Sequence, residues 1–320
     1  MRRRVITCLA AAALLTTACR NVEETQPRPV VRIFRLGGNQ ALTDALAAEY
    51  TEKLRYVEVR LNETAITSFQ AIDAIQDGTA DAGIVSADAG YLASIGQLPT
   101  RAPAAQLRGI ALLQITALHV LAAGNSTIET LADLRGKRVR MGPRNPPGPI
   151  NDTSLVADLT LRAFNLHSQD MSPVTMPLAE SLTQVVDGRL DAAFVNASYP
   201  FDTIRPTLES GARLIAITGG ATSTLVERYP FIRTVTIPAG TYPGQRAALD
   251  TVGVNVVLVC SAALDEAVVY DLTRTFFDAL PHLAAGHAAL RLMDPEQAPA
   301  TLIPLHDGAA RYYRELELFR

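Results

Sequence analysis

The sequence predicts a two-lobed α/β protein whose second lobe is inserted into the first. Three observations support this fold class. Segments with strand-like and helix-like apolar spacing alternate along most of the chain. A pattern of acidic, glycine and apolar positions occurs twice, at an offset of 110 residues, in 77–87 and 187–197. Two long apolar runs, 107–123 and 251–260, carry the chain into the second lobe and back.

The two runs define the predicted lobes. We expect lobe I to comprise 30–118 and 252–320, and lobe II to comprise 119–251. A chain of 320 residues with 48% hydrophobic character can bury cores of this size. The formal net charge of −3 gives no sign of a nucleic-acid-binding surface, so we expect no nucleic-acid partner.

The repeated pattern is an Asp-Gly-x-x-Asp turn followed by an apolar strand. Gly78 and Gly188 stand where a helix ends and a left-handed backbone costs little. Asp81 and Asp191 precede the strands, and we expect them to be structural, accepting N–H groups of the turn. Helix, Asp-Gly and strand also follow one another in many unrelated α/β proteins, so the repeat alone leaves that alternative open.

The amino terminus predicts export. Arg2, Arg3 and Arg4 precede the apolar stretch 5–15, which is too short to span a bilayer. The stretch ends in Thr-Thr-Ala followed by Cys19, which is similar to a lipoprotein processing site. We therefore expect a lipoprotein signal peptide at 1–18, a tether at 19–29, and a periplasmic protein attached to the membrane by lipid on Cys19. Cleavage near this site without lipidation is the alternative.

The first lobe begins with a predicted strand at 30–36 and a turn containing Gly37, Gly38, Asn39 and Gln40. Further expected elements are helices at 41–54, 66–76 and 88–95, strands at 56–61 and after Asp81, a helix at 265–279, and a closing loop and helix at 303–315. The lone Cys260 lies in an apolar run, so we expect a buried thiol with no disulfide partner and no metal-binding companion.

The second lobe shows the same alternation. Expected elements are a short helix at 130–135, a strand at 139–141, a Pro/Gly-rich loop at 142–149, helices at 151–164, 178–186, 201–210 and 223–229, and strands at 174–177, after Asp191, and at 214–217. No helix or strand is predicted for 229–244.

Polar residues that follow the repeated strands are the first candidates for ligand contact, because ligands of open α/β sheets lie beyond the carboxyl ends of the strands. These candidates are Ser86 and Asp88 in lobe I, and Asn196, Ser198 and Tyr199 in lobe II.

Two strand-to-helix corners add further candidates, because backbone N–H groups at a helix start receive anions. The first corner contains Gly38, Asn39 and Gln40. The second contains Arg144 and Asn145, where an arginine suits a carboxylate. A solvated loop side chain is the alternative for Arg144. Tyr242 has two open interpretations, lining the cleft or packing under the hinge.

No catalytic or metal-binding constellation is expected. The five histidines are scattered, without a carboxylate at metal or triad spacing: His119, His167, His282, His287 and His306. Nucleophile-elbow and phosphate-loop motifs are absent from the sequence. We therefore expect a binding protein that is not an enzyme and uses no cofactor.

Two motifs resemble a known family. Ile237-Pro238-Ala239-Gly240-Thr241-Tyr242-Pro243-Gly244, preceded by Tyr229-Pro230-Phe231, and Pro304-Leu305-His306 with Gly308 and Ala310-Arg311-Tyr312-Tyr313, are similar to motifs of the TAXI family. These are solute-binding proteins of TRAP (tripartite ATP-independent periplasmic) transporters. The resemblance runs from about 31 to 318. It implies a Venus-flytrap fold, the type II periplasmic-binding-protein fold. It also implies capture of a small organic anion or amino acid, such as a dicarboxylate or glutamate, for a TRAP-type permease.

The resemblance weakens where the ligand would lie. Gly37-Gly38-Asn39-Gln40 lacks the family's aromatics, only Ser68 corresponds at the start of the second helix, and Asp88 alone remains of a Gln-Ser-Asp motif. This divergence implies an unusual ligand, or a protein no longer used for uptake. A membrane-tethered sensor or interaction module without a transport role is therefore the competing function. An ABC-type binding protein is a third, against which the motif at 237–244 argues.

Overall fold

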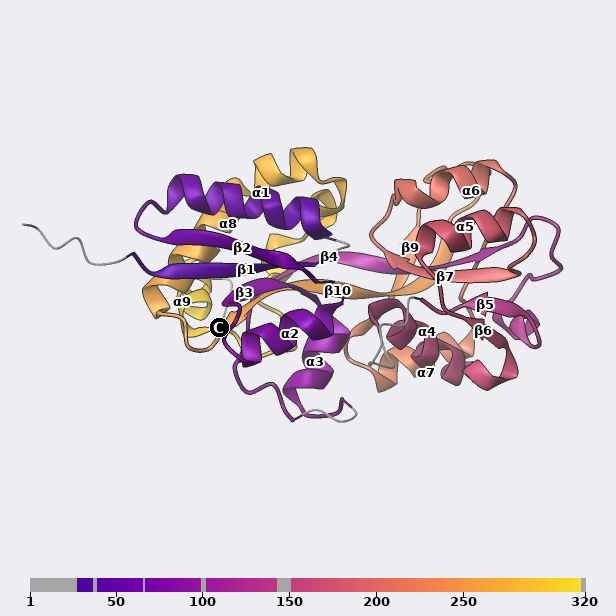
Figure 1. The fold of residues 1–320 in the computed structure, drawn as a ribbon, viewed down its shortest axis with the longest axis horizontal. Coiled ribbons are helices and arrows are strands. Elements are labelled where there is room, and N and C mark those ends of the chain that lie inside the picture. Colours follow the sequence, from indigo (N-terminus) through magenta and orange to yellow (C-terminus); the bar gives the residue numbers. More distant parts are fainter. Residues whose placement is uncertain (1–27, 37–38, 66, 99–101, 143–150, 318–320) are drawn as a thin grey trace, which may run out of the picture.

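The structure is a computed structural model that describes residues 28–36, 39–65, 67–98, 102–142 and 151–317. The predicted signal peptide and Cys19 lie outside the described residues, as do Gly38, Arg144 and Asn145. Figure 1 shows two α/β lobes joined by two long strands. None of the described helices combines the length and apolar character needed to cross a bilayer.

The described strands form one sheet through both lobes. Their order is β2-β1-β3-β10-β4-β7-β5-β6, with β8 paired to β4 and β9 paired to β10. The bounds are β1 Val30–Leu36, β2 Glu58–Ala65, β3 Ala82–Ser86, β4 Leu107–Ala122, β5 Arg138–Arg140, β6 Ser172–Val174, β7 Ala192–Ala197, β8 Arg213–Ile215, β9 Ile232–Ile237 and β10 Leu249–Ser261. The pairs of β1 with β2 and β3, and of β5 with β6 and β7, are parallel, whereas β4 and β10 run antiparallel to their neighbours.

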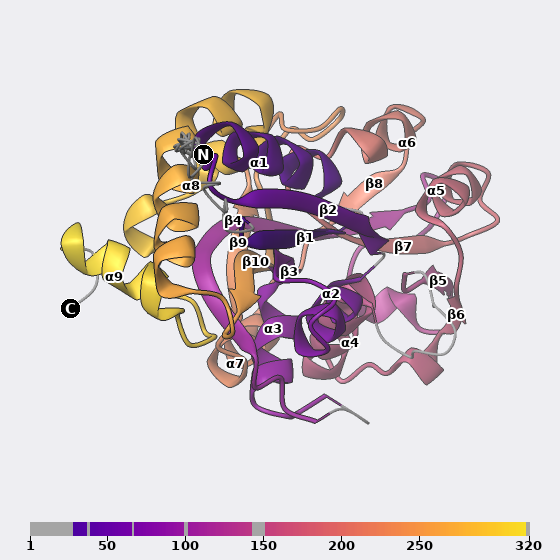
Figure 2. The same ribbon diagram turned by 60° about the vertical axis from the view of Figure 1, so that its left-hand side comes forward.

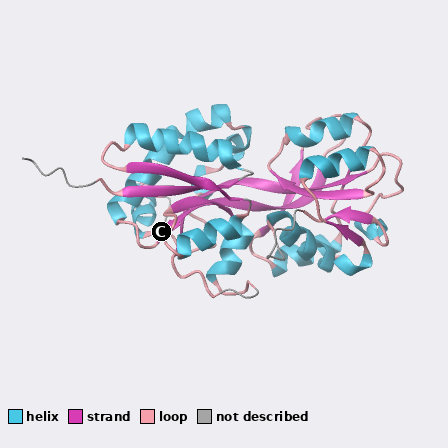
Figure 3. Cartoon of the chain, viewed as in Figure 1, coloured by secondary structure: helices cyan, strands magenta, loops and turns pink. Residues whose placement is uncertain are grey.

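Helices cover both faces of this sheet (Figure 3). They are α1 Gln40–Lys53, α2 Ser68–Gln76, α3 Ala87–Ser94, α4 Asp152–Ala163, α5 Leu178–Val186, α6 Arg205–Glu209, α7 Gly220–Arg228, α8 Glu266–Gly286 and α9 Asp307–Glu315. Short 3-10 helices occupy Leu131–Leu134, Ser168–Asp170, Asp202–Ile204, Ala288–Leu292 and Pro295–Gln297. One apolar core packs beneath α2, α3 and α4 and runs through both lobes.

β4 and β10 belong to both lobes. They pair with each other from Leu107 and Ser261 to Ala117 and Gly253. Beyond that point β4 pairs with β7 and β8, while the start of β10 pairs with β9. The predicted lobe boundaries, 118/119 and 251/252, therefore fall inside these two strands, where the chain bends from one lobe to the other.

Most predicted elements match the structure within a few residues, and three differ. The segment 229–244 contains β9, whose inward residues Ile232, Val235 and Ile237 are buried. The helix expected to end at 279 continues through Pro281 to Gly286, because Leu283 still packs in the core. β2 begins and ends later than 56–61, because its pairing with β1 sets its bounds.

Candidate functional site

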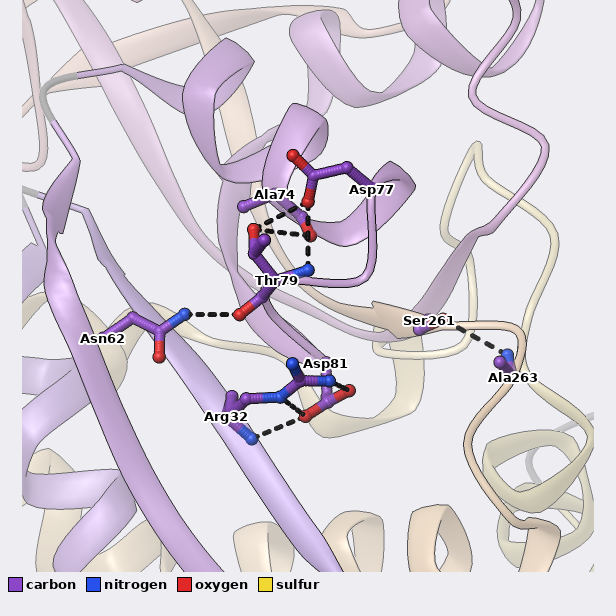
Figure 4. Close-up of polar contacts among 8 residues, drawn as sticks. All are labelled: Arg32, Asn62, Ala74, Asp77, Thr79, Asp81, Ser261 and Ala263. Carbon is purple, nitrogen blue, oxygen red and sulfur yellow. Dashed lines mark hydrogen bonds and ion pairs between the residues drawn. The ribbon is translucent and has the colours of Figure 1, made fainter.

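Each copy of the repeat fixes its lobe by the same contact. In lobe I the carboxylate of Asp81 accepts hydrogen bonds from the backbone N, Nε and Nη2 of Arg32, each at 2.8 Å (Figure 4). In lobe II the carboxylate of Asp191 accepts the equivalent three bonds from Arg138, at 2.8 to 3.0 Å. Asp81 and Asp191 are structural, as expected, although the main donor is an arginine of the neighbouring strand and not the turn.

These contacts align parallel strands in each lobe, and the strand ends meet between the lobes. A cavity of about 290 Å³ lies there. Both lobes contribute polar lining residues, including Asn39, Ser86, Arg140, Asp152, Asn196 and Ser198. Other hollows, behind α4 and between α1 and α8, are each lined by a single lobe. The cavity between the lobes is therefore the candidate site.

Arg140, which the sequence analysis missed, is the main cation in this cavity. Its side chain is only 3% exposed. Nη1 donates to the carbonyl of Phe194 at 2.8 Å and Nε to the carbonyl of Met176 at 3.2 Å. Burial lowers the pKa of Arg140 to about 10, so the guanidinium is still charged at neutral pH. Within the described residues it forms no ion pair.

A sequence signal for Arg140 exists in hindsight. Arg138 and Arg140 are two apart in β5, so they lie on the same face of the strand. The charge of Arg138 is neutralised by Asp191. Arg140 lies two residues nearer the carboxyl end of β5, and the repeat has no second acidic residue after Asp191 that could pair with it.

Ser86 and Asp88 lie together at the end of β3, as predicted. Asp88 is fully buried, and one of its oxygens, Oδ1, accepts hydrogen bonds from the Ser86 hydroxyl and from the backbone N of Ala89. Its Oδ2 has no hydrogen-bond partner among the described residues. Burial raises the pKa of Asp88 to about 6. Ser86 lines the cavity directly, with Asp88 behind it.

Asp152, a second residue the sequence analysis missed, joins the lobes. Its carboxylate accepts the backbone N–H of Ser68 at 3.2 Å, linking the starts of α4 and α2, which lie close together in Figure 2. The Oγ of Ser68 accepts the backbone N–H of Ser86 at 2.8 Å, so Ser68 supports the site from beneath. Desolvation, followed by the nearby charge of Asp88, raises the pKa of Asp152 to about 7.

Of four other predicted site residues, three line the cavity and one does not. Asn196 and Ser198 line the cavity from the end of β7, and the buried Oδ1 of Asn196 has no hydrogen-bond partner in the part of the chain that the structure describes. Asn39 lines it from lobe I, with its Oδ1 held by Gln114 at 3.4 Å. Gln40 opens α1 outside the lining of the cavity.

Tyr242 packs beneath the cavity and is not one of its lining residues. Its side chain is 3% exposed and lies in the lobe II core. The hydroxyl accepts the backbone N–H of Phe201 at 3.0 Å and lies 2.8 Å from Nε2 of His119. Burial lowers the pKa of His119 to about 4, so this ring is neutral. Tyr199, joined to Pro200 by a cis peptide bond, packs against the same core and is not a lining residue.

The side chains that line the cavity can recognise a polar ligand. The lining offers a guanidinium, a carboxyl group, hydroxyls and amides. Among the described residues, no group of three or more metal-ligating side chains gathers at one place.

Solved structures share this fold. The protein XAC2383 from Xanthomonas citri, bound to ATP, has 13% identity and a TM-score of 0.54, with 91% of this chain and 99% of that chain covered. The periplasmic sulfonate-binding protein SsuA of a putative sulfonate ABC transporter, from Methylobacillus flagellatus KT, has 14% identity and a TM-score of 0.51, with 91% and 88% covered. At these identities the likeness shows the fold alone, which is the two-lobed type II fold of periplasmic binding proteins.

A family model assigns the chain more directly. The NMT1-like family matches residues 40–316, which include most of both lobes and every cavity-lining residue named above except Asn39. This match supports the predicted class of fold without singling out the TAXI family. The chain belongs to the NMT1-like family.

Proposed function

We propose that this protein captures a small organic anion between its lobes, outside the cytoplasm, and presents it to a membrane permease. The observation that carries the proposal is Arg140, a buried cation in an interlobe cavity with no carboxylate partner among the described residues. A buried charge without a counterion is costly, and an anionic ligand would offset that cost.

Closure of the lobes would couple binding to presentation. Lining residues come from both lobes, so a bound ligand bridges them and favours the closed arrangement over the open one. The hydrogen bond between Ser68 and Asp152 is one contact that closure forms. A permease would then recognise the closed surface.

The permease class is the finer part of the proposal. The motif at 237–244 favours a TRAP-type permease and a dicarboxylate-like or glutamate-like ligand. The SsuA protein described above belongs to a putative sulfonate ABC transporter, so the experiment must distinguish a TRAP-type permease from an ABC-type permease. If the TRAP assignment is right, uptake in cells will stop when the ion gradient is collapsed while ATP is maintained. Uptake that follows ATP and ignores the gradient would contradict it.

The proposal also covers where the protein is located and whether it alters its ligand. The signal-like segment before Cys19 supports export and a lipid anchor. Labelling with a fatty acid, compared between the natural chain and Cys19→Ser, tests the anchor. We also propose binding without turnover, because the sequence has no nucleophile-elbow motif and the described residues hold no group of three or more metal-ligating side chains. Ligand recovered chemically altered after release would contradict this, and a ligand that acts only on a signalling partner would favour the sensor function.

The central experiment is a thermal-shift screen of small organic anions, followed by calorimetry on natural protein, Arg140→Gln and Arg140→Lys. A ligand at a hundredfold excess over Kd stabilises the native state by about 2.7 kcal/mol. We expect Arg140→Gln to bind at least about thirtyfold more weakly, since it leaves the ligand's charge unpaired, and Arg140→Lys to retain part of the affinity.

The matched control is Arg162→Gln, because Arg162 forms an exposed ion pair with Asp158 on α4, outside the cavity. Its affinity should equal that of the natural protein. The proposal fails if no organic anion shifts the melting temperature, or if a folded Arg140→Gln binds the anion as tightly as the natural chain.

A further inference from the structure

The cavity holds two opposite charges that do not meet. Arg140 and Asp152 both line it. Among the described residues, the carboxylate of Asp152 accepts the N–H of Ser68 and Arg140 donates to carbonyl groups alone, so neither residue neutralises the other. A direct ion pair would form readily in a cavity that needed no ligand, because Coulomb attraction is strong away from water. The separation indicates a ligand that carries both signs of charge.

Besides Asp152, the lining includes two groups that can accept a hydrogen bond, the Ser86 hydroxyl and the Oδ1 of Asn196. The Ser86 hydroxyl gives its one proton to Asp88, so its lone pairs remain for the cavity. Asp88 thus acts as a positioning residue, because it fixes the direction of a hydroxyl that could otherwise rotate. The buried Oδ1 of Asn196 is a further acceptor, to which none of the described residues donates.

Acceptors of this kind require a donor in the bound state, since an unpaired buried acceptor is costly. A simple carboxylate or sulfonate supplies no donor and would repel Asp152. A protonated amine supplies up to three donors and a positive charge. It is therefore complementary to Asp152, Ser86 and Asn196 together.

We propose that the ligand is a zwitterion, whose acid group pairs with Arg140 and whose ammonium group is bound by Asp152, the Ser86 hydroxyl and the Asn196 side-chain oxygen. This rests on the proposed function and narrows its ligand class. Ser86 belongs to lobe I, whereas Asp152 and Asn196 belong to lobe II. The ammonium group therefore bridges the lobes, and its presence is what holds them closed.

The test compares pairs of compounds that differ only in the amine. Taurine is matched with ethanesulfonate, β-alanine with propionate, and 4-aminobutyrate with butyrate, so that acid type and chain length vary independently. Calorimetry on the natural protein should show at least about tenfold tighter binding of the amine-bearing member in the best pair. Equal or tighter binding of the amine-free anion overturns this inference and leaves the proposed function standing. If neither member of any pair binds, and the anion screen also finds nothing, both fail.

Variants locate the ammonium site. Asp152→Asn keeps the size and an acceptor for Ser68 but loses the charge, so it should remove most of the preference for the amine while still binding the acid group. Asp158→Asn, on the same helix and outside the cavity, is the matched control and should keep the preference. Asp88→Ala removes the acceptor of the Ser86 hydroxyl, leaves that hydroxyl free to turn toward the cavity, and should weaken the amine-bearing ligand selectively. An unchanged preference in folded Asp152→Asn overturns the assignment.

The pH dependence provides a second readout. The charged groups that share the surroundings of Asp152 in the described structure are Asp88 of α3 and Arg140 of β5. Ionised carboxylates attract the ammonium group, so its binding releases protons and tightens from about pH 5.5 to about pH 8. An amine-free anion should follow the opposite trend, because it binds best when the carboxyl groups are neutral. The same trend for both compounds would contradict the proposal.

Discussion

Aspartates with the same chemistry have opposite pKa shifts in this protein because their neighbours differ. Arg138 holds the pKa of Asp191 below its ordinary value by hydrogen bonding to the ionised form. Burial raises the pKa of Asp88 and Asp152 to about 6 and about 7, with no cation in contact. The contribution of Asp191 to stability is therefore present above the ordinary carboxyl pKa and is lost as the pH falls. The first kind of aspartate stabilises a lobe, and the second kind is available to a ligand.

The hydrogen bonds between Arg32 and Asp81 give a prediction of their own. Asp81→Ala removes three hydrogen bonds from Arg32 and should lower the free energy of unfolding by roughly 1–3 kcal/mol. Ligand affinity should be unchanged at a temperature where the variant is folded. Asp77→Asn is the control, because Asp77 is exposed and its side chain bonds to Thr79 alone among the described residues, so its effect should stay within about 0.5 kcal/mol. Chemical denaturation measures both, and a loss of affinity in Asp81→Ala would contradict a purely structural role.

At the scale of elements, the sequence predicted those whose pattern is local. The repeat placed β3 and β7 correctly, because an Asp-Gly stop before an apolar run is a local signal. β9 was missed, because its burial depends on β10, which lies further along the chain. Candidate residues at strand ends, such as Ser86 and Asn196, do line the cavity.

The site residues that escaped prediction owe their role to tertiary contacts. Arg140 has the appearance of an exposed strand residue until β7 covers it, and Asp152 appears to be an ordinary helix-start acid until lobe I approaches it. For Tyr242 the sequence left two positions open, lining the cleft or packing under the hinge, and only the packed core shows that its hydroxyl accepts the N–H of Phe201 from beneath the cavity. The predicted contacts of Gly38, Arg144 and Asn145 stay predictions, because these residues lie outside the described part of the chain.

The crossing of β4 and β10 depends on one glycine. A Cβ on Gly253 would lie 2.0 Å from the carbonyl oxygen of Thr116 and 2.8 Å from a methyl of Val235. Gly253→Ala should therefore separate the strands and lower the free energy of unfolding by at least about 1–3 kcal/mol. Gly286→Ala, with open space around its Cβ at the end of α8, is the matched control and should be neutral or slightly stabilising. Equal melting temperatures for the two variants would contradict the close approach.

Across the whole molecule, the lobes touch on the side of α2, α3 and α4. Ser68 contacts Asp152 there, and the rings of Tyr91 and Phe231 lie 5.7 Å apart between centroids. Asp152 is partly desolvated where the lobes touch, and we expect an open cleft to solvate it fully, with an ordinary carboxyl pKa near 3.9. Because the closed form has the higher pKa, closure takes up protons.

The ligand-free protein should therefore be most compact in acid. The contribution of Asp152 to closure is fully present below its ordinary pKa and is lost as the pH rises through about 7. Small-angle scattering should show a larger radius of gyration at about pH 8 than at about pH 5.5. Asp152→Asn cannot ionise and should remove most of that difference, while Asp158→Asn should keep it. A radius independent of pH in the natural chain would refute this coupling.

The position of β10 also constrains how the molecule assembles as its chain is made. β10 lies between β3 and β4 in the sheet, yet it follows them by the whole length of the second lobe. Until residues 249–261 arrive, β3 and β4 each present an open edge, and unpaired edges of apolar strands are templates for other chains. During synthesis from the amino end, β7 and β8 of the second lobe can pair with β4 before β10 exists. The sheet of the first lobe is completed later, when β10 pairs with β3 and β4. The connection between the lobes, formed by β4 and β10, is therefore completed only when β10 has been synthesised.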